Sequence, residues 1–468
     1  MTDLSDLTIA EASRLLEKRE VTAVELLEAH LTRIVTTEPA LNSYVVVLVD
    51  TARAEAEASD ARVVDGGRLG PLDGIPIAVK DLYDIAGVVT TGGTGAYRSR
   101  VAAEDSTAVR RLRSAGAVFL GKTNTHELAF GGTTNNIHYG ATHNPWNLER
   151  VPGGSSGGSG SALAARQALG ALGTDTGGSI RIPAAFCGVT GHKPTYGLVG
   201  RTGITPLSHT LDHAGPMART AEDCALLLDV LTGYDEHDLD SIARPAVDFT
   251  AGLEDGVGGL RFAIIPSMLK DAVPAVEANF LAAVDVLRSL GATVIEVEPM
   301  EDHPDWRAAL TGLISVECYS YHQALMEEPS QIGPAVRSRI AQAFDRTAWD
   351  YARGLDVRKL AERHFEAVLR EHHLAGYLAP TSPITAPPID PDQERDQAPP
   401  TIFVNTTVFD MTHQPSISVP CGFDAEGLPT GLMISGALWD DATVLSAAHA
   451  FQGATDWHTK APALPDGD

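Results

Sequence analysis

The sequence has few of the features that mark membrane, secreted or nucleic-acid-binding proteins. Among its 468 residues are four cysteines that are far apart and form no CxxC pair: Cys187, Cys224, Cys318 and Cys421. This spacing predicts reduced, buried thiols and not a disulfide framework. There is no apolar run of about 18 residues, and the first residues lack a basic segment followed by an apolar one. We therefore expect neither a membrane span nor a signal peptide.

Basic residues are also in short supply. There are 35 Lys and Arg residues against 61 Asp and Glu residues, so the formal net charge is −26. A chain this acidic disfavours nucleic acid or an anionic membrane as a partner and favours solubility. We expect a cytoplasmic protein that acts on a small molecule.

Glycine, in contrast, is concentrated in one stretch, from Pro152 to Pro194. This stretch holds two clusters that contain serine, GGSSGGSG at residues 153–160 and DTGGSIR at residues 175–181. Glycine allows backbone conformations with positive φ and close approach to a ligand. Backbone N–H groups in such a turn can converge near Ser179 and bind an oxyanion. A serine hydroxyl is a weak nucleophile, however, until a base takes its proton.

The strongest candidate for that base is Lys80. It follows Ile75–Val79, an apolar run that predicts a short buried strand. A lysine held in a low dielectric at the end of a buried strand has a lowered pKa, so the neutral amine can accept a proton.

Four segments, in this order, resemble the amidase signature family of serine hydrolases: GIPIAVKD, PGGSSGGSG, GTDTGGSIRIPA and GHKPTYGLV. The later segments LDHAGPMARTAEDCALLLDVLTG and PSISVPCGFDAEGLPTGLMISG also agree, so the resemblance covers most of the chain. It implies an α/β fold, with a single domain in which a central mixed, twisted β-sheet is covered on both faces by helices.

The resemblance also implies a catalytic machinery. Ser179 would be the nucleophile that accepts the acyl group, Ser155 the bridging serine after a cis peptide bond from Gly154, and Lys80 the base. The family's oxyanion hole maps onto the backbone N–H groups of Thr176, Gly177, Gly178 and Ser179. Asp175 and Arg181 are expected to brace this loop, with contact to a substrate carboxylate as an alternative role for Arg181.

The substrate is less well specified by the sequence. By the resemblance, the loop Ala129, Phe130, Gly131 and Gly132 borders the substrate pocket, and Phe130 either stacks on an aromatic substrate or packs in the core. Tyr319 and Tyr321 are further pocket candidates. No cluster of arginines demands an anionic substrate, so we expect a neutral carboxylic amide such as an aryl amide, with ester or carbamate (urethane) cleavage on the same site. A homodimer is a family expectation.

We expect no cofactor and no metal. His209 and His213 have a spacing that suits a metal only on a helix, whereas Pro206 and Gly215 favour a loop, and no third ligand is evident. Cys187 is expected to be a core residue and not a nucleophile.

Other functions remain open. Within the family, the alternative is an amidotransferase A-type component that serves Gln-tRNA or Asn-tRNA formation with partner proteins. From another class, Gly116–Thr123 matches the phosphate-loop pattern GxxxxGK[ST], although its four variable residues favour a buried strand. Gly153–Gly157 matches GxSxG, but no hydrophobic strand precedes it. A catalytically silent binding protein is disfavoured, because Lys80, Ser155 and Ser179 are all present.

The resemblance and the hydrophobic periodicity together imply a single domain, residues 1–468, with four parts. Residues 1–65 predict helices, with N-caps at Thr8 and Thr22. Residues 66–300 form the signature core, which includes a strand–helix–strand unit at residues 261–297. Residues 301–400 predict a helical cap that faces the substrate and ends in a proline-rich loop. Residues 401–468 predict the last strands and a terminal helix.

Overall fold

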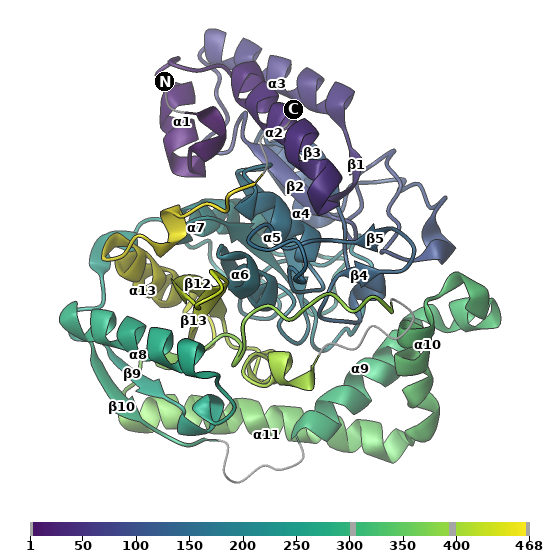
Figure 1. Cartoon of the computed structure of the whole chain (residues 1–468), viewed down its shortest axis with the longest axis vertical. Helices are drawn as coiled ribbons and strands as arrows, with labels where there is room; N and C mark the ends of the chain where they lie inside the picture. The colour runs from purple at the N-terminus through teal and green to yellow at the C-terminus, as the bar shows by residue number, and fades with distance from the viewer. Residues whose placement is uncertain (1–2, 300–305, 393–398, 465–468) are drawn as a thin grey trace.

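The computed structural model describes residues 3–299, 306–392 and 399–464, and one large mixed β-sheet runs through it (Figure 1). Eleven strands pair in the order β1-β3-β2-β6-β8-β7-β12-β13-β11-β9-β10. Strands β2, β3 and β6 run parallel at one end, as do β9, β10 and β11 at the other, and the pairs between β6 and β11 are antiparallel. The predicted α/β class with a mixed sheet is therefore confirmed.

The strands are short and the central ones are buried on both faces. Their bounds are β1 Tyr44–Val47, β2 Pro76–Lys80, β3 Val118–Thr123, β6 Gly170–Asp175, β7 Thr190–Lys193, β8 His213–Ala218, β9 Arg261–Ile264, β10 Thr293–Glu296, β11 Gly376–Pro380, β12 Ser416–Phe423 and β13 Pro429–Gly436. A separate two-stranded sheet joins β4 (Asn135–Asn136) to β5 (Gly140–Ala141).

Helices flank the sheet. Their bounds are α1 Ile9–Glu17, α2 Ala23–Leu41, α3 Val49–Val64, α4 Thr107–Ser114, α5 Gly157–Ala164, α6 Arg181–Cys187, α7 Ala221–Leu231, α8 Pro274–Ser289, α9 Trp306–His322, α10 Pro334–Ala341, α11 Ala348–His372, α12 Thr407–Met411 and α13 Asp441–Gly453. Helices α5 and α6 pack together on β6, β7, β12 and β13, and α7, α8 and α13 form a second group over the same part of the sheet. Because the two groups share strands without packing on each other, they lie on opposite faces.

Local signals in the sequence explain several boundaries. Thr8 and Thr22 cap α1 and α2, each with a complete capping box, as predicted. The unit β9–α8–β10 is a parallel β-α-β unit, as the periodicity of residues 261–297 indicates. Helices α9, α10 and α11 form a layer along one edge of the molecule, so the helical prediction for this segment is also confirmed (Figure 1). Residues 301–305 and 393–398, within the expected cap and proline-rich loop, lie outside the described residues.

The phosphate-loop alternative is wrong. Val118–Thr123 forms strand β3, which pairs with β2 and is buried along its whole length. Lys122 is fully buried, and its Nζ lies 2.7 Å from Asp81 Oδ1 and 2.9 Å from Thr90 Oγ1. Because the Lys122 side chain is buried and paired with the carboxylate of Asp81, a nucleotide cannot reach its ammonium group.

The described helices include none that is long and apolar enough to cross a bilayer. All four cysteines are free and buried, as expected. Burial raises the pKa of the Cys187 thiol, whose Sγ contacts the Pro152 carbonyl oxygen, so this residue belongs to the core.

Candidate active site

Lys80 lies at the C-terminal end of β2 and is completely buried. Its Nζ lies 2.7 Å from Ser155 Oγ, 2.8 Å from Ser156 Oγ and 2.8 Å from Thr174 Oγ1. Burial holds the pKa of Lys80 well below its usual value, although the carboxylates of Asp175 and Asp212 act in the opposite direction. A neutral amine has two N–H bonds and one lone pair, so it can donate to two of these hydroxyls and accept from the third. This geometry suits a base.

The peptide bond between Gly154 and Ser155 is cis, as the resemblance implies. The Ser155 carbonyl oxygen accepts hydrogen bonds from Thr125 Oγ1 at 2.8 Å and from the His126 N–H at 3.1 Å. Glycine is required at position 154, because a Cβ there would lie 2.8 Å from the backbone of Gly132. The loop that carries Ser155 is therefore fixed on both sides by neighbouring backbone.

Ser179 lies in the loop between β6 and α6 and lines a cavity of 330 Å³. The two glycine loops are joined by a hydrogen bond from the Ser156 N–H to the Ser179 carbonyl oxygen at 3.2 Å. Among the described residues, no hydrogen bond connects the Ser155 and Ser179 hydroxyls. The structure thus forms the Lys80–Ser155 half of the predicted relay, whereas the step from Ser155 to Ser179 stays a prediction.

The oxyanion-hole prediction requires one change. The Gly178 N–H donates to Asp175 Oδ1 at 2.5 Å, so it is already engaged. The N–H groups of Thr176, Gly177 and Ser179 make no hydrogen bond to any residue that the structure describes, and these three residues line the cavity. Three of the four predicted donors are therefore available to a substrate oxygen.

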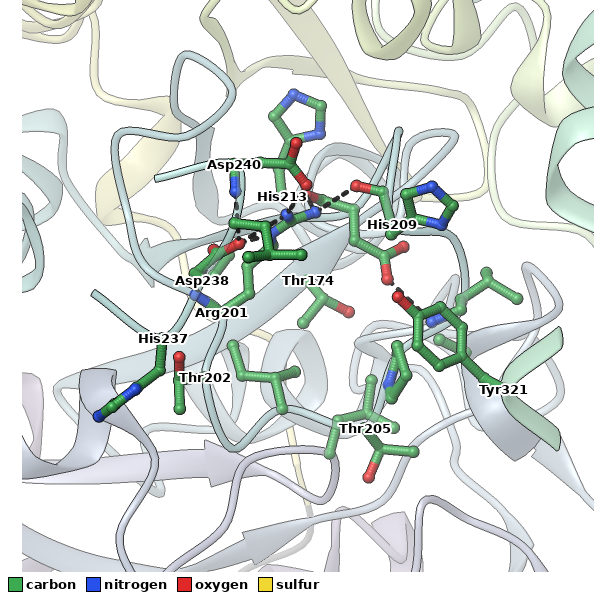
Figure 2. Close-up of a pocket in the computed structure, with 18 of the residues that line it drawn as sticks. Thr174, Arg201, Thr202, Thr205, His209, His213, His237, Asp238, Asp240 and Tyr321 are labelled. Carbon is green, nitrogen blue, oxygen red and sulfur yellow. Dashed lines mark hydrogen bonds and ion pairs between the residues drawn. The ribbon is translucent and has the colours of Figure 1, made fainter. Parts of the chain in front are cut away.

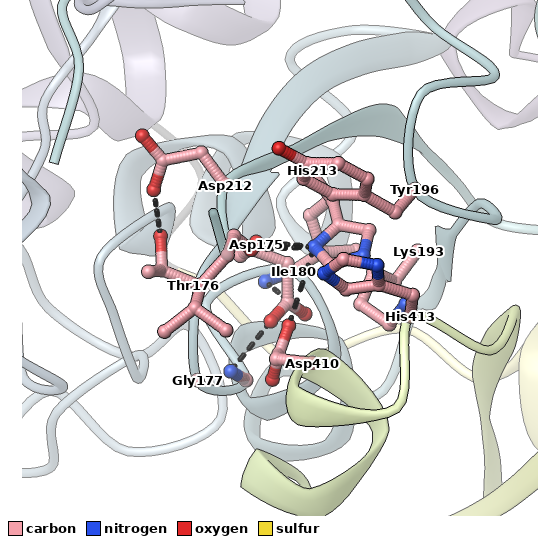
Figure 3. A network of polar contacts seen from close by, with 12 residues as sticks. Asp175, Thr176, Gly177, Ile180, Lys193, Tyr196, Asp212, His213, Asp410 and His413 are labelled. Carbon is pink, nitrogen blue, oxygen red and sulfur yellow. Dashed lines mark hydrogen bonds and ion pairs between the residues drawn. The ribbon is translucent and has the colours of Figure 1, made fainter. Parts of the chain in front are cut away.

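Asp175 and Arg181 brace the nucleophile loop, and Figure 3 shows Asp175 beside Gly177 and Ile180. Asp175 accepts hydrogen bonds from the backbone N–H of Ile180 at 3.1 Å and from Arg181 Nε at 2.9 Å. Burial opposes ionisation of Asp175, but the Arg181 guanidinium, together with Lys193 and Asp410, lowers the pKa of that carboxyl below its usual value. Arg181 is fully buried and also contacts Asp410 Oδ2 at 2.7 Å. The geometry matches the bracing role and leaves Arg181 no access to a substrate carboxylate.

The predicted substrate loop does border the same cavity. Ala129, Phe130, Gly131 and Gly132 all line it together with Ser179. Both glycines are sterically necessary, because a Cβ at Gly131 would overlap the His126 ring and one at Gly132 would lie 2.5 Å from Phe403. Tyr319 is not part of this lining and packs against Phe344, with ring centroids 5.0 Å apart.

Sequence reasoning missed one charged residue of the cavity, Arg339 of α10. Its Nη1 donates to the Phe130 carbonyl oxygen at 2.5 Å and lies 3.2 Å from His126 Nε2. Nothing near Arg339 in the sequence marks it, because only the packing of α10 over the substrate loop brings it here. The other lining residues of the cap are apolar or neutral: Leu310, Thr311 and Ile314 of α9.

Ser156, Thr174 and Asp212 were also missed. The first two contact Lys80 Nζ directly. Asp212 accepts a hydrogen bond from Thr176 Oγ1 at 2.6 Å and from the N–H groups of Leu207 and Ser208. All three lie within the segments that carry the family resemblance, but the sequence does not show that they contact Lys80 or the oxyanion loop.

Comparison with known proteins agrees with this geometry. A family model described as Amidase matches residues 25–445. The chain belongs to the amidase signature family. It is 40% identical to the A-type component of glutamyl-tRNA(Gln) amidotransferase from Roseiflexus sp. strain RS-1, over 99% of this chain and 100% of that protein.

Solved structures also place the chain in the amidase signature family. A protein from a vestigial complex linked to the origin of an s-triazine catabolic enzyme has a TM-score of 0.90 and 33% identity, over 96% of this chain and 98% of that one. A bacterial aryl acylamidase of the amidase signature family has a TM-score of 0.88 and 29% identity, over 97% of this chain and 99% of that one. This chain is thus an amidase signature enzyme, and the enzymes of this family act on C–N bonds. The expected urethane cleavage finds no support in these relatives.

Proposed function

We propose that this enzyme cleaves a carboxamide whose acyl part carries an anionic group, with the side-chain amide of glutamine as the substrate to test first. The observation that carries the proposal is Arg339, a guanidinium in the lining of a 330 Å³ cavity that also contains Ser179. Charge-assisted hydrogen bonds between arginine and a carboxylate are strong and directional. Relatives named as the A-type component of glutamyl-tRNA(Gln) amidotransferase, which match at 37–40% identity over at least 97% of this chain, support the same choice.

The proposed reaction begins with proton transfer. Neutral Lys80 takes a proton from Ser155, which takes one from Ser179, and Ser179 Oγ attacks the amide carbon. The N–H groups of Thr176, Gly177 and Ser179 stabilise the oxyanion of the tetrahedral intermediate. The leaving nitrogen receives its proton from Ser155, and Lys80 returns one to Ser155. Water then releases the acyl group from Ser179, with the same base.

A role within an amidotransferase complex would add one step. In a complex with partner proteins, the ammonia released from glutamine would be passed to an acyl group held by a partner. Ammonia release from glutamine is common to that role and to stand-alone hydrolysis, so it is measured first.

A second candidate substrate is a neutral aryl amide, as the sequence led us to expect. The supporting observation is the apolar remainder of the same lining, which includes Phe130 and Phe403 as well as aliphatic side chains. Aromatic faces of this kind stack on an aryl group.

The two candidates separate in one experiment. Ammonia release from L-glutamine and from the neutral amide butyramide is measured for the wild type and for Arg339→Gln, with aniline release from acetanilide in parallel. If the proposal is right, Arg339→Gln lowers kcat/KM for glutamine about 10- to 100-fold, because a charge-assisted bond of about 1.5–3 kcal/mol is lost, and changes butyramide much less. Equal losses on both amides, or a clear preference for acetanilide, favour the aryl amide.

A further inference from the structure

Helix α9 carries a buried carboxyl group, that of Glu317, which the proposed reaction does not use. The Glu317 side chain is almost completely buried. Its oxygens accept hydrogen bonds from Ser208 Oγ, from the Thr210 N–H at 3.2 Å, from Thr210 Oγ1 at 2.8 Å and from the Tyr351 hydroxyl at 2.9 Å. Among the described residues, the one basic group within ion-pair distance is His209 Nε2, at 3.7 Å. Burial of a carboxyl group is costly unless hydrogen bonds offset it, and here most of them come from one loop, which they fasten to α9.

That loop, residues 207–212, separates two cavities. Leu207 lines both the catalytic cavity and a second cavity of 530 Å³, and Figure 2 shows His209 and His213 among the residues around the second one. On the side of this larger cavity, Arg201 Nη1 donates to the His209 carbonyl oxygen at 2.6 Å. Because the cavities leave the loop fewer packing partners, its hydrogen bonds to other segments fix its position.

Ser208 connects Glu317 to Asp212 within this loop. Its hydroxyl donates to Glu317 Oε2, and its backbone N–H donates to Asp212 Oδ2 at 2.9 Å. Asp212 Oδ1 in turn accepts a hydrogen bond from Thr176 Oγ1 at 2.6 Å (Figure 3). A continuous chain of hydrogen bonds thus leads from α9 to Thr176, whose backbone N–H is one of the proposed oxyanion donors.

The same helix forms a wall of the acyl pocket. Leu310, Thr311 and Ile314 of α9 line the catalytic cavity. Glu317 follows Ile314 by three positions, so the two side chains are neighbours on one side of the helix. A single helix therefore contacts the acyl pocket and, one turn later, holds the start of the chain that ends in the oxyanion loop.

We propose that Glu317 is a positioning residue for the oxyanion hole: through Ser208 and Asp212 it fixes Thr176 relative to α9, so that the acyl pocket and the oxyanion donors are held as one unit. Oxyanion donors are effective only when they are held in advance where the negative charge develops, and a displacement of about 1 Å can cost 100-fold in rate. The inference rests on the proposed Ser179 chemistry, but not on glutamine as the substrate.

The test measures acylation and turnover in variants at both ends of the chain. Single-turnover release of p-nitrophenolate from p-nitrophenyl butyrate gives the acylation rate constant, and ammonia release from butyramide gives kcat and KM. We expect Glu317→Ala to lower the acylation rate constant and kcat about five- to tenfold with little change in KM. This loss is smaller than the 100- to 1,000-fold that follows removal of an oxyanion donor, because the Thr176 N–H is displaced and not deleted.

A double-mutant cycle separates this role from a merely structural one. Thr176→Val breaks the same chain at its other end, so adding Glu317→Ala to Thr176→Val should lower the rate less than about twofold further. Glu317→Gln keeps an acceptor oxygen for Ser208 and should recover most of the lost rate. Glu371→Gln, on the exposed side of α11, is the matched control and should keep the wild-type constants.

Ser208→Ala provides the same comparison if Glu317→Ala does not fold. It removes only the hydroxyl that reaches Glu317 and keeps the N–H that binds Asp212. We expect a smaller loss of the acylation rate constant, about two- to fivefold, since the Thr210 contacts with Glu317 remain. This loss should also disappear in the Thr176→Val background.

Failure of the inference and failure of the proposed function give different results. If the losses from Glu317→Ala and Thr176→Val multiply, if a folded Glu317→Ala keeps the wild-type rate, or if only KM rises, Glu317 does not act through the oxyanion loop and the Ser179 chemistry stands. If the wild type releases no p-nitrophenolate and forms no covalent adduct on Ser179 with phenylmethylsulfonyl fluoride, the proposed function is wrong and the inference fails with it.

Discussion

Asp410 Oδ2 lies 2.7 Å from Nη2 of Arg181, and this contact joins the C-terminal part of the chain to the helix that follows the nucleophile loop. Asp410 belongs to α12, whose neighbour Thr406 donates a hydrogen bond from Oγ1 to the Gly177 carbonyl oxygen at 2.6 Å. The loop that holds Gly177 and Ser179 is thus held by a segment that comes late in the sequence, and Figure 3 shows Asp410 of this segment close to Gly177. Its shape depends on the whole domain, not on the glycine motif alone.

This contact predicts a loss of stability. Asp410→Ala leaves the buried Arg181 guanidinium with one carboxylate partner and opens a small void, so we expect the free energy of unfolding to fall by about 3 kcal/mol. Urea unfolding measures the change. Asp271→Ala, in an exposed turn, is the control and should lose much less. A loss for Asp410→Ala no larger than the control would show that the brace contributes nothing to stability.

Ser179→Ala should abolish acyl-enzyme formation. The nucleophilic oxygen is removed, and Ser155, whose Oγ contacts Lys80, should not replace it because it lies outside the lining of the substrate cavity. Intact-protein mass spectrometry after incubation with phenylmethylsulfonyl fluoride measures the adduct. One adduct on the wild type and on the surface control Ser289→Ala, and none on Ser179→Ala, is the expected pattern. An adduct that persists in Ser179→Ala would place the nucleophile elsewhere.

The pH dependence follows from Lys80. Burial lowers its pKa well below the usual value, and the neutral amine is the active form. Activity should therefore be present above the pKa of Lys80 and be lost as the pH falls through it, so the acid limb of the profile lies far below the usual lysine value of about 10.4.

Lys80→Ala tests that assignment. We expect kcat at neutral pH to fall about 100- to 10,000-fold, as is typical when a general base is removed, and to recover partly at high pH as hydroxide takes over. A pH–rate profile of both proteins measures the effect. A small defect that is the same at every pH would mean that Lys80 is not the base.

Thr176→Val tests the link between the oxyanion loop and Asp212. Valine keeps the shape and the backbone N–H but removes the hydroxyl that lies 2.6 Å from Asp212 Oδ1. Because the loop would be less well positioned, kcat should fall about tenfold while KM changes little, as for an interaction made mainly in the transition state. Steady-state kinetics with one amide give both constants. A rise in KM alone would show that Thr176 acts in ground-state binding instead.

Lys122 should be structural. In Lys122→Ala the buried carboxylate of Asp81 loses the Nζ that lies 2.7 Å away, and we expect a loss of about 3–5 kcal/mol in the free energy of unfolding. Isothermal titration of the wild type with ATP and Mg²⁺ should show no heat of binding. Measurable ATP binding that Lys122→Ala removes would revive the phosphate-loop alternative.

The local structure was predictable where short-range physics decides it. Capping boxes at Thr8 and Thr22 fix two helix starts, and the apolar run before Lys80 fixes a buried strand. The phosphate-loop pattern at Gly116–Thr123 was resolved in favour of a strand for the same reason, since its variable residues are apolar. The resemblance also identified Ser179 and the loop at residues 129–132, which line the catalytic cavity, and Lys80 and Ser155, which contact each other.

By itself, the sequence determined the helices and strands whose signals lie within one turn or one strand, and the motifs that supply the proposed base and nucleophile. Only the tertiary structure decided which side chains meet them. Arg339 enters the substrate cavity because α10 packs over the loop of Phe130, and Gly178 is lost as an oxyanion donor because Asp175 turns back to accept its N–H. Such contacts join segments that no local pattern relates, so their energies depend on packing that forms only when the whole chain has folded.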